Sequence, residues 1–240
     1  MSARVVQEQD RAEPPRRWRC ESDPRAPVSP SANTIAVKAL LVRAVTPGAI
    51  RPLIVAYHYL HSMPAACWRC FGVYAGDRLM GAAVFTAGPR HGYRVLVGAR
   101  PQQVAILARL WLADALPKNA ESRVIAILIR LLRREQKWKL LLSYADPAAG
   151  HGGIIYRASG WLYLGIGQPS RYLDLGDGNP LHPRTAYDRL GANNLGHLRR
   201  SGVLARNIIQ SGKHRYAYVL DPAWRWRLRE APQPYPKAAS

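Results

Sequence analysis

The 240-residue chain is poor in cysteine, phenylalanine and acidic residues, and it has no long run of apolar residues. Three cysteines are too few, and odd in number, for a disulfide framework. Cys67 and Cys70 form a single CxxC, but no second cysteine pair or histidine pair accompanies it at zinc spacing. We favour ordinary strand residues over a redox or metal site as the interpretation of this pair.

The two longest apolar stretches, residues 53–60 and 124–132, are interrupted by His58 and Arg130. Both fall well short of the roughly 18 uninterrupted residues that a membrane span requires. Residues 1–19 are polar and lack the apolar core of a signal peptide. We therefore expect a soluble, cytoplasmic protein without a membrane partner, and the 48% of apolar residues excludes a wholly disordered chain.

The scarcity of acids produces a strong charge imbalance, with 35 Lys and Arg against 15 Asp and Glu and a net charge of +20. Residues 1–34 contribute little to it and are rich in proline, which predicts a disordered leader. We expect a folded domain over residues 35–221 and a flexible basic tail over residues 222–240. A surface dominated by one sign of charge favours a polyanionic partner such as nucleic acid.

Alternating and helical apolar patterns predict an α/β fold with one mixed central sheet flanked by helices. Residues 104–112 also fit helical spacing, and we interpret them as a strand. The predicted strands cover residues 33–45, 67–75, 79–86, 104–112, 138–144, 161–164 and 215–220, and the predicted helices cover residues 47–59, 119–137, 152–159 and 183–193.

Five short motifs follow one another along the chain, and together they are more specific than any one alone. They are Tyr57–His61, Phe71–Tyr74, Lys118–Ile125, Ser143–Pro147 with Gly150–Tyr156, and Trp161–Gly165. In this order they closely resemble the Mom proteins of phage Mu and related phages. The resemblance covers residues 35–221, and residues 213–216 also look like the tail of that family.

The resemblance implies a GNAT acyltransferase-like fold with a basic C-terminal extension, in the cytoplasm of a host bacterium. It also implies a transferase that converts adenine in DNA to N6-carbamoylmethyladenine and so protects phage DNA from restriction endonucleases. The functional residues of the family fall here on two groups. The catalytic group is His58, Tyr59 and Asp146, and the cofactor-binding group is Tyr74, Arg109, Ser122 and Tyr156.

Asp146 stands out from the residues themselves, because residues 35–170 contain only five acids. It directly follows a predicted buried strand, where open α/β sheets place groups that handle ligands. A carboxylate there can orient the weakly nucleophilic N6 amine of adenine and accept its proton. A helix cap or a partner for one of the many arginines is the competing interpretation.

His58 and His61 lie three residues apart at the end of a predicted helix, and tyrosines flank His58. Aromatic side chains beside a histidine suit stacking against a base taken out of the duplex. We therefore expect His58, Tyr59 and Asp146 to converge on the adenine, with helix capping and packing as the alternative. The same residues permit an iron ion, although the sequence does not demonstrate a metal.

Ser122 lies in the first turn of a predicted helix, where free backbone N–H groups favour a phosphate or carboxylate. Acetyltransferases typically carry a glycine-rich RxxGxG/A loop at this point for coenzyme A, whereas this chain has Pro117–Ser122. Acetyl-coenzyme A is therefore a doubtful donor, and the identity of the acyl donor stays open. A simple helix cap explains Ser122 equally well.

Basic residues are interleaved with aromatic ones in the last 45 residues, a pattern that suits backbone contacts and stacking on DNA. We expect double-stranded DNA to contact Arg199, Arg200, Arg206, Lys213 and Arg215. A solvated basic tail is the alternative, and the sequence is compatible with a homodimer. Two other functions stay open: an acyltransferase acting on protein or RNA, and a non-catalytic nucleic-acid-binding protein.

Overall fold

The computed structural model describes residues 36–236 except for residues 90 and 179. The leader expected over residues 1–34 lies outside the described residues. None of the helices in the described part is long and apolar enough to cross a lipid bilayer.

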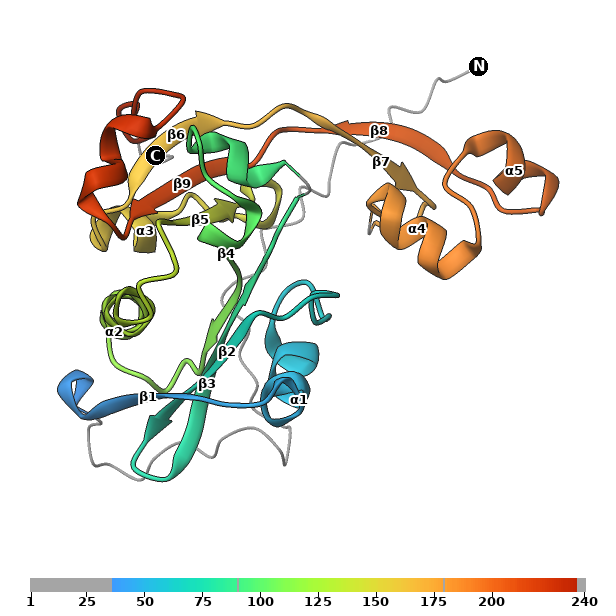
Figure 1. The fold of residues 1–240 in the computed structure, drawn as a ribbon. Coiled ribbons are helices and arrows are strands. Elements are labelled where there is room, and N and C mark those ends of the chain that lie inside the picture. The colour runs from blue at the N-terminus through green and yellow to red at the C-terminus, as the bar shows by residue number, and fades with distance from the viewer. Residues whose placement is uncertain (1–35, 90, 179, 237–240) are drawn as a thin grey trace, which may run out of the picture.

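A seven-stranded sheet forms the centre of the molecule, with strand order β1-β2-β3-β4-β5-β9-β6 (Figure 1). Strands β4 and β5 run parallel, and every other neighbouring pair is antiparallel. The expected mixed α/β architecture is confirmed. The strands are β1 (Leu40–Ala44), β2 (Arg69–Ala75), β3 (Arg78–Thr86), β4 (Val104–Leu112), β5 (Leu140–Ala145), β6 (Leu162–Ile166) and β9 (His214–Val219).

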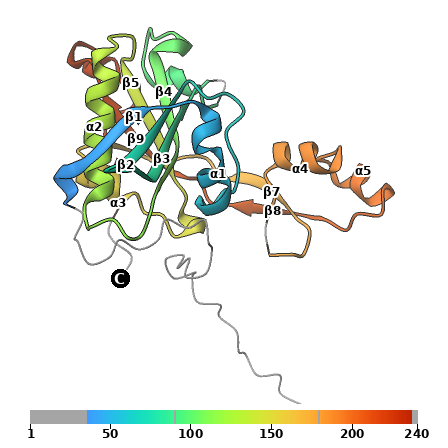
Figure 2. The same cartoon turned by 90° about the horizontal axis from the view of Figure 1, so that it is seen from below.

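Helices cover both faces of this sheet (Figures 1 and 2). Helix α2 (Ala120–Arg134) and the short α3 (Ile154–Ala158) belong to one apolar cluster, and α1 (Pro47–Tyr57) belongs to another. Successive side chains of β4 point to opposite faces of the sheet. Leu107 packs on the α2 side and Ile106 on the opposite side. The three predicted helices that flank the sheet therefore form, with ends that differ by a few residues.

A second structural unit, residues 170–210, projects from the sheet between β6 and β9, and we call it the arm (Figure 1). It consists of the two-stranded antiparallel ribbon β7 (Ser170–Asp174) and β8 (Arg206–Gln210) with helices α4 (Pro183–Leu190) and α5 (Leu195–Arg200). An apolar cluster of its own includes Leu173, Ala186 and Leu198. The basic extension expected at the C-terminus is therefore largely an insertion, because β9 returns to the sheet after it.

The segment after Asp221 packs against the sheet domain, although the sequence predicts a flexible tail from residue 222. A 3₁₀-helix spans Pro222–Arg227, and a β-bridge joins Leu228 to Leu96. Near the end of the described residues, the Tyr235 hydroxyl donates to the Trp161 carbonyl at 2.5 Å. These contacts join the segment to residues far away in the sequence, which local composition does not reveal.

Candidate functional site

A cavity of about 610 Å³ opens where β4 and β5 stop pairing. The two strands are paired only from Val104 and Leu140 to Leu107 and Ser143, so the residues that follow in each strand no longer hydrogen-bond across. The walls come from the end of α1, the loops before β2 and after β3, the arm and the start of β9. Its polar lining includes Tyr59, Thr86, Arg109, Tyr144, Tyr172, His182, Arg184 and Lys213.

An ion pair between Asp146 and Lys213 lies at this cavity, with 2.7 Å between Oδ2 and Nζ. The antiparallel register of β5 and β9 pairs Ala145 with His214, which sets Asp146 beside Lys213. The other carboxylate oxygen accepts a hydrogen bond from the Ala148 backbone N–H at 3.1 Å. Burial lowers the pKa of Lys213, but the bond to Asp146 and the nearby tyrosines outweigh it and raise the pKa overall.

Tyr59 lies between two imidazoles at the cavity wall. Its ring stacks on His58 with 4.6 Å between ring centroids, and it meets the His151 ring edge-on with 4.9 Å between centroids. Burial raises the pKa of Tyr59, an effect that nearby Lys213 reduces and Asp146 reinforces. At neutral pH Tyr59 therefore presents a flat ring and a protonated hydroxyl to the cavity.

His58 is buried behind Tyr59 and supports it. Its Nδ1 accepts a hydrogen bond from the Leu60 N–H at 3.1 Å, so the tautomer assigned here carries its proton on Nε2. Burial, followed by the charges of Arg109, His151 and His61, lowers the pKa of His58 to about 3. His58 is therefore neutral at physiological pH and acts through position rather than charge.

His58 and His61, which lie three residues apart at the end of α1, make separate hydrogen bonds. The Nδ1 atom of His61 lies 3.0 Å from the Val55 carbonyl, while His58 bonds the Leu60 N–H. Across residues 36–236, where they are described, no group of three His, Cys, Asp or Glu side chains could hold a metal ion. The residues present therefore do not fit the iron ion that the sequence permitted.

The depressed pKa of His58 predicts that the free energy of unfolding decreases as the pH is lowered from 7 towards 4. An unfolded histidine titrates near 6.5, so between that value and about 3 the unfolded chain binds a proton that the folded chain excludes. His58→Asn keeps an acceptor for the Leu60 N–H and removes the titration. From pH 7 to pH 4 we expect the wild type to lose roughly 3 kcal/mol more unfolding free energy than this variant.

Denaturant unfolding monitored by circular dichroism at several pH values measures this difference. Parallel stability curves for the wild type and His58→Asn would mean that His58 takes up a proton over the same pH range in the folded and the unfolded chain. The buried, neutral imidazole described above would then be wrong.

Arg109 on β4 joins the same cavity. Its Nε donates to the Ser62 carbonyl at 2.8 Å, which ties β4 to the loop that follows α1. Burial lowers the pKa of Arg109, and its positive charge acts on both His58 and Tyr59. The structure thus brings Arg109 together with Tyr59 and Lys213, although its sequence surroundings carried little signal.

Tyr156 lies behind β5, on the side of the sheet that α2 covers. Its hydroxyl is 2.6 Å from the Ser143 Oγ, which donates to the Leu107 carbonyl. Burial raises the pKa of Tyr156 to about 12, and its ring packs 5.0 Å from that of Tyr216. Tyr156 therefore holds the end of β5 in place and does not line the cavity.

Tyr74 and Ser122 lie outside the cavity. Tyr74 is near the far end of β2, paired with Leu79 in β3, whereas the cavity adjoins the Thr86 end of β3. The Arg43 guanidinium sits over its ring at 5.4 Å. Ser122 Oγ donates to the Asn119 carbonyl at 3.0 Å, within the first turn of α2. Neither contact points to a ligand, and a binding role for these two residues stays a prediction.

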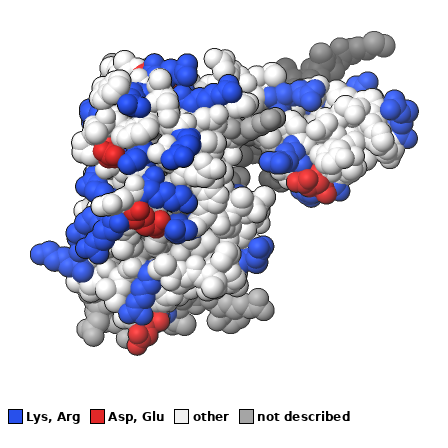
Figure 3. All heavy atoms as spheres, viewed as in Figure 1, with Lys and Arg blue, Asp and Glu red and all other residues white. Residues whose placement is uncertain are grey.

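The five basic residues expected to contact DNA fall into two groups. Arg199 and Arg200 are exposed on α5 in the arm. The other three are ion-paired: Arg206 with Asp174, Arg215 with Glu230, and Lys213 with Asp146. Figure 3 shows Lys and Arg side chains on both the sheet domain and the arm, with few acidic side chains on that face.

Sequence reasoning missed the tyrosines and histidines that the arm and neighbouring strands bring to the cavity. Tyr144 comes from β5, while Tyr172 and His182 come from the arm and contact each other with 5.5 Å between ring centroids. His151 follows Gly150, and its only sequence signal was that short glycine-rich turn. For Tyr172 the sequence carried no signal, because neither arm strand was predicted. His182 directly precedes a predicted helix, and nothing in the sequence linked it to a site.

Comparison with known proteins defines the class of this protein. The model of the Mom protein family matches residues 39–237, so the chain belongs to the Mom protein family. Over 208 residues it is 29% identical to methylcarbamoylase Mom of Escherichia phage Mu, covering 83% of this chain and 85% of that protein. The family resemblance seen in the sequence is confirmed, and with it the expectation of a transferase.

Acetyltransferases are among the solved structures that align with this protein. A spermidine N-acetyltransferase from Vibrio cholerae aligns at a TM-score of 0.46 with 10% identity, covering 79% of this chain and 98% of that one. An acetyltransferase from Bacillus subtilis in complex with CoA aligns at 0.41 with 14% identity, covering 75% and 98%. Similarity this low supports no inference about ligands.

Proposed function

We propose that this protein is a DNA modification enzyme that converts adenine to N6-carbamoylmethyladenine in double-stranded DNA. The observation that carries the proposal is the Asp146–Lys213 pair beside Tyr59, at a cavity of about 610 Å³ in a Mom-family chain. The methylcarbamoylase of phage Mu supports the choice of transferred group. The modification would act in the host cytoplasm and protect the DNA from restriction endonucleases.

Catalysis has to overcome the weak nucleophilicity of the adenine N6 amine, whose lone pair is delocalised into the ring. The N6 amine attacks the methylene carbon of an activated carbamoylmethyl donor. The new N–C bond forms as the bond between that carbon and the leaving group breaks, and the leaving group departs with the electron pair. A carboxylate oxygen of Asp146 receives the N6 proton.

The neighbours of Asp146 suit it to this role. The Lys213 ammonium holds one carboxylate oxygen at 2.7 Å, and the carboxylate can accept a hydrogen bond from the amine. The Ala148 N–H fixes the other oxygen, so the carboxylate has one orientation. Oriented groups of this kind lower a barrier by removing the entropy cost of alignment.

Tyr59 supplies the surface against which the adenine ring stacks. Enzymes that modify bases commonly take the base out of the duplex and stack it between aromatic or apolar side chains. His58 positions the Tyr59 ring at 4.6 Å and, being neutral, adds no charge beneath the base. His58 is therefore a positioning residue, whereas Tyr59 and Asp146 contact the substrate.

The arm supports the choice of DNA as the partner. Its residues Tyr172, His182 and Arg184 line the cavity, and its helix α5 carries the exposed Arg199 and Arg200. A duplex lying along the arm places an extruded base within reach of the cavity. Arginine contacts to phosphates would then fix the position of the duplex.

The sequence leaves an acyl donor such as acetyl-coenzyme A possible but doubtful, with Ser122 among the residues that the family resemblance assigns to the cofactor. The residues present do not fit this cofactor, because the Ser122 hydroxyl is bonded to the Asn119 carbonyl and the preceding loop lacks the glycines of a pyrophosphate-binding turn. The donor named above is therefore specified by its reactive group alone.

Nucleoside analysis tests the proposed function. DNA from cells expressing the wild-type protein is digested to nucleosides, which are separated and weighed by mass spectrometry. We expect deoxyadenosine to gain one carbamoylmethyl group, and fragmentation to place that group on N6. Unmodified deoxyadenosine from cells with ample folded protein would contradict the proposal and favour an acyltransferase acting on protein or RNA.

A further inference from the structure

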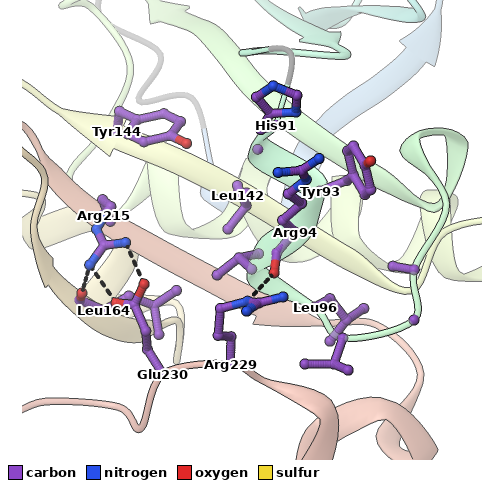
Figure 4. Close-up of a pocket in the computed structure, with 15 residues that line it drawn as sticks. His91, Tyr93, Arg94, Leu96, Leu142, Tyr144, Leu164, Arg215, Arg229 and Glu230 are labelled. Atoms are coloured by element: carbon purple, nitrogen blue, oxygen red, sulfur yellow. Dashed lines mark hydrogen bonds and ion pairs between the residues drawn. The ribbon is translucent and has the colours of Figure 1, made fainter.

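A second cavity, of about 620 Å³, lies over strands β5, β9 and β6 (Figure 4). Residues 91–99 form one wall, and Arg229 and Glu230 from the C-terminal segment form another. Its volume is within the range of small-molecule sites, which are about 300–1,000 Å³. No residue proposed for catalysis lines this cavity.

The floor of this cavity is apolar. Leu96, Leu142 and Leu164 are almost completely buried and belong to one cluster with Ala217 beneath them. The Tyr93 side chain stands at the wall beside Arg94 (Figure 4). A flat or apolar portion of a ligand can therefore pack against the leucine side chains of the floor.

The polar rim carries mainly positive charge. Arg94, Arg215 and Arg229 line the cavity, and His91 lies at one end. Glu230 is the acidic residue in the lining. Glu230 is already engaged, because Arg215 binds both of its carboxylate oxygens at 3.0 and 2.6 Å. The remaining charges on the cavity rim, those of Arg94 and Arg229, are positive, so an anion is the complementary ligand.

A buried donor supports this polarity. The Nε atom of Arg215 is buried and has no hydrogen-bond partner among the described residues. Buried donors in folded proteins are nearly always satisfied by protein, water or ligand. Arg215, which lines the cavity, thus carries one N–H group that no described residue accepts.

The two cavities adjoin at Tyr144, which lines both. A molecule in the second cavity therefore lies next to the first cavity, which Tyr59 also lines. We propose that the second cavity is a binding site for a small organic anion with a flat or apolar body. Its position suits the anionic portion of the group donor, an assignment that rests on the proposed function.

Three matched ring compounds test the site in the full-length protein. Phenyl phosphate and benzoate carry the same ring with two kinds of anion, and benzamide keeps the ring without the charge. Titrations of ¹⁵N-labelled protein at about 0.15 M salt, which screens diffuse attraction, give the affinities and the responding residues. We expect at least one anion to bind several-fold more tightly than benzamide and to shift the amides of residues 91–99.

A pair of variants locates the charge. Arg94→Met removes an exposed arginine from the rim, and Arg130→Met removes an exposed arginine from α2 on the other side of the sheet. Losing one charge-assisted hydrogen bond weakens binding about tenfold. We expect Arg94→Met to lose the anion preference and Arg130→Met to keep it.

Binding of benzamide as tight as that of both anions would overturn the proposed anion preference. Equal weakening by Arg94→Met and Arg130→Met would overturn the site by showing diffuse attraction to a basic surface. Neither result depends on whether the protein modifies DNA. A failure of this site is therefore distinguishable from a failure of the proposed function.

Discussion

Asp146→Asn is expected to abolish nearly all DNA modification while leaving the fold intact. Asparagine keeps an oxygen that accepts the Ala148 N–H but cannot take up the N6 proton as the N–C bond forms. A positioned general base contributes about 10²- to 10⁴-fold to a rate, so we expect a loss within that range. The measurement is the yield of modified deoxyadenosine per unit time with purified DNA or in cells.

Asp174→Asn is a close structural control for this variant. Asp174 also accepts a backbone N–H from the residue two positions on, at 2.8 Å, and also pairs with a basic side chain at 2.7 Å. It lies in the arm rather than at the cavity. We expect Asp174→Asn to keep activity within a few-fold, and equal losses in the two variants would mean that Asp146 only supports the structure.

Much of the sheet domain could be predicted because its elements have strong local patterns. In α2, Val124, Leu128 and Leu132 repeat at helical spacing and are all buried against the sheet. The predicted first strand, over residues 33–45, was less accurate. In the described residues a 3₁₀-turn spans Val37–Ala39 and the strand begins at Leu40, because alternation alone does not show where pairing with β2 starts.

The arm could not be predicted in the same way. Its strands β7 and β8 are five residues each and mix polar with apolar side chains without a clear period. They are stabilised by pairing with each other across about thirty intervening residues, and by the small cluster around Leu173. Sequence patterns report local preference, whereas this ribbon depends on distant contacts.

The candidate site shows the same limit at the level of single residues. Asp146 could be singled out because it follows a buried strand in a chain with few acids. Lys213 is 67 residues away in the sequence, and its basic, aromatic-rich surroundings indicated contact with DNA. Only the antiparallel pairing of β5 with β9 reveals that Lys213 holds Asp146.

Lys213→Met is therefore expected to reduce catalysis rather than DNA affinity. Without the ammonium, the Asp146 carboxylate keeps only the Ala148 N–H and loses its fixed orientation at the cavity. A misplacement of about 1 Å in an oriented site can cost on the order of a hundredfold in rate, and we expect a loss of that size in kcat. Lys213→Arg keeps the charge and should recover part of the activity.

The salt dependence of DNA binding separates this role from the phosphate contact expected from the sequence. A lysine bound to phosphate contributes about one to the slope of log Kd against log salt concentration. We expect Lys213→Met to leave that slope and the DNA affinity nearly unchanged. Arg199→Met with Arg200→Met, both on the exposed face of the arm, should lower the slope and weaken binding about tenfold. A reduced slope for Lys213→Met with unchanged kcat would return Lys213 to the DNA-contacting residues and remove it from the catalytic site.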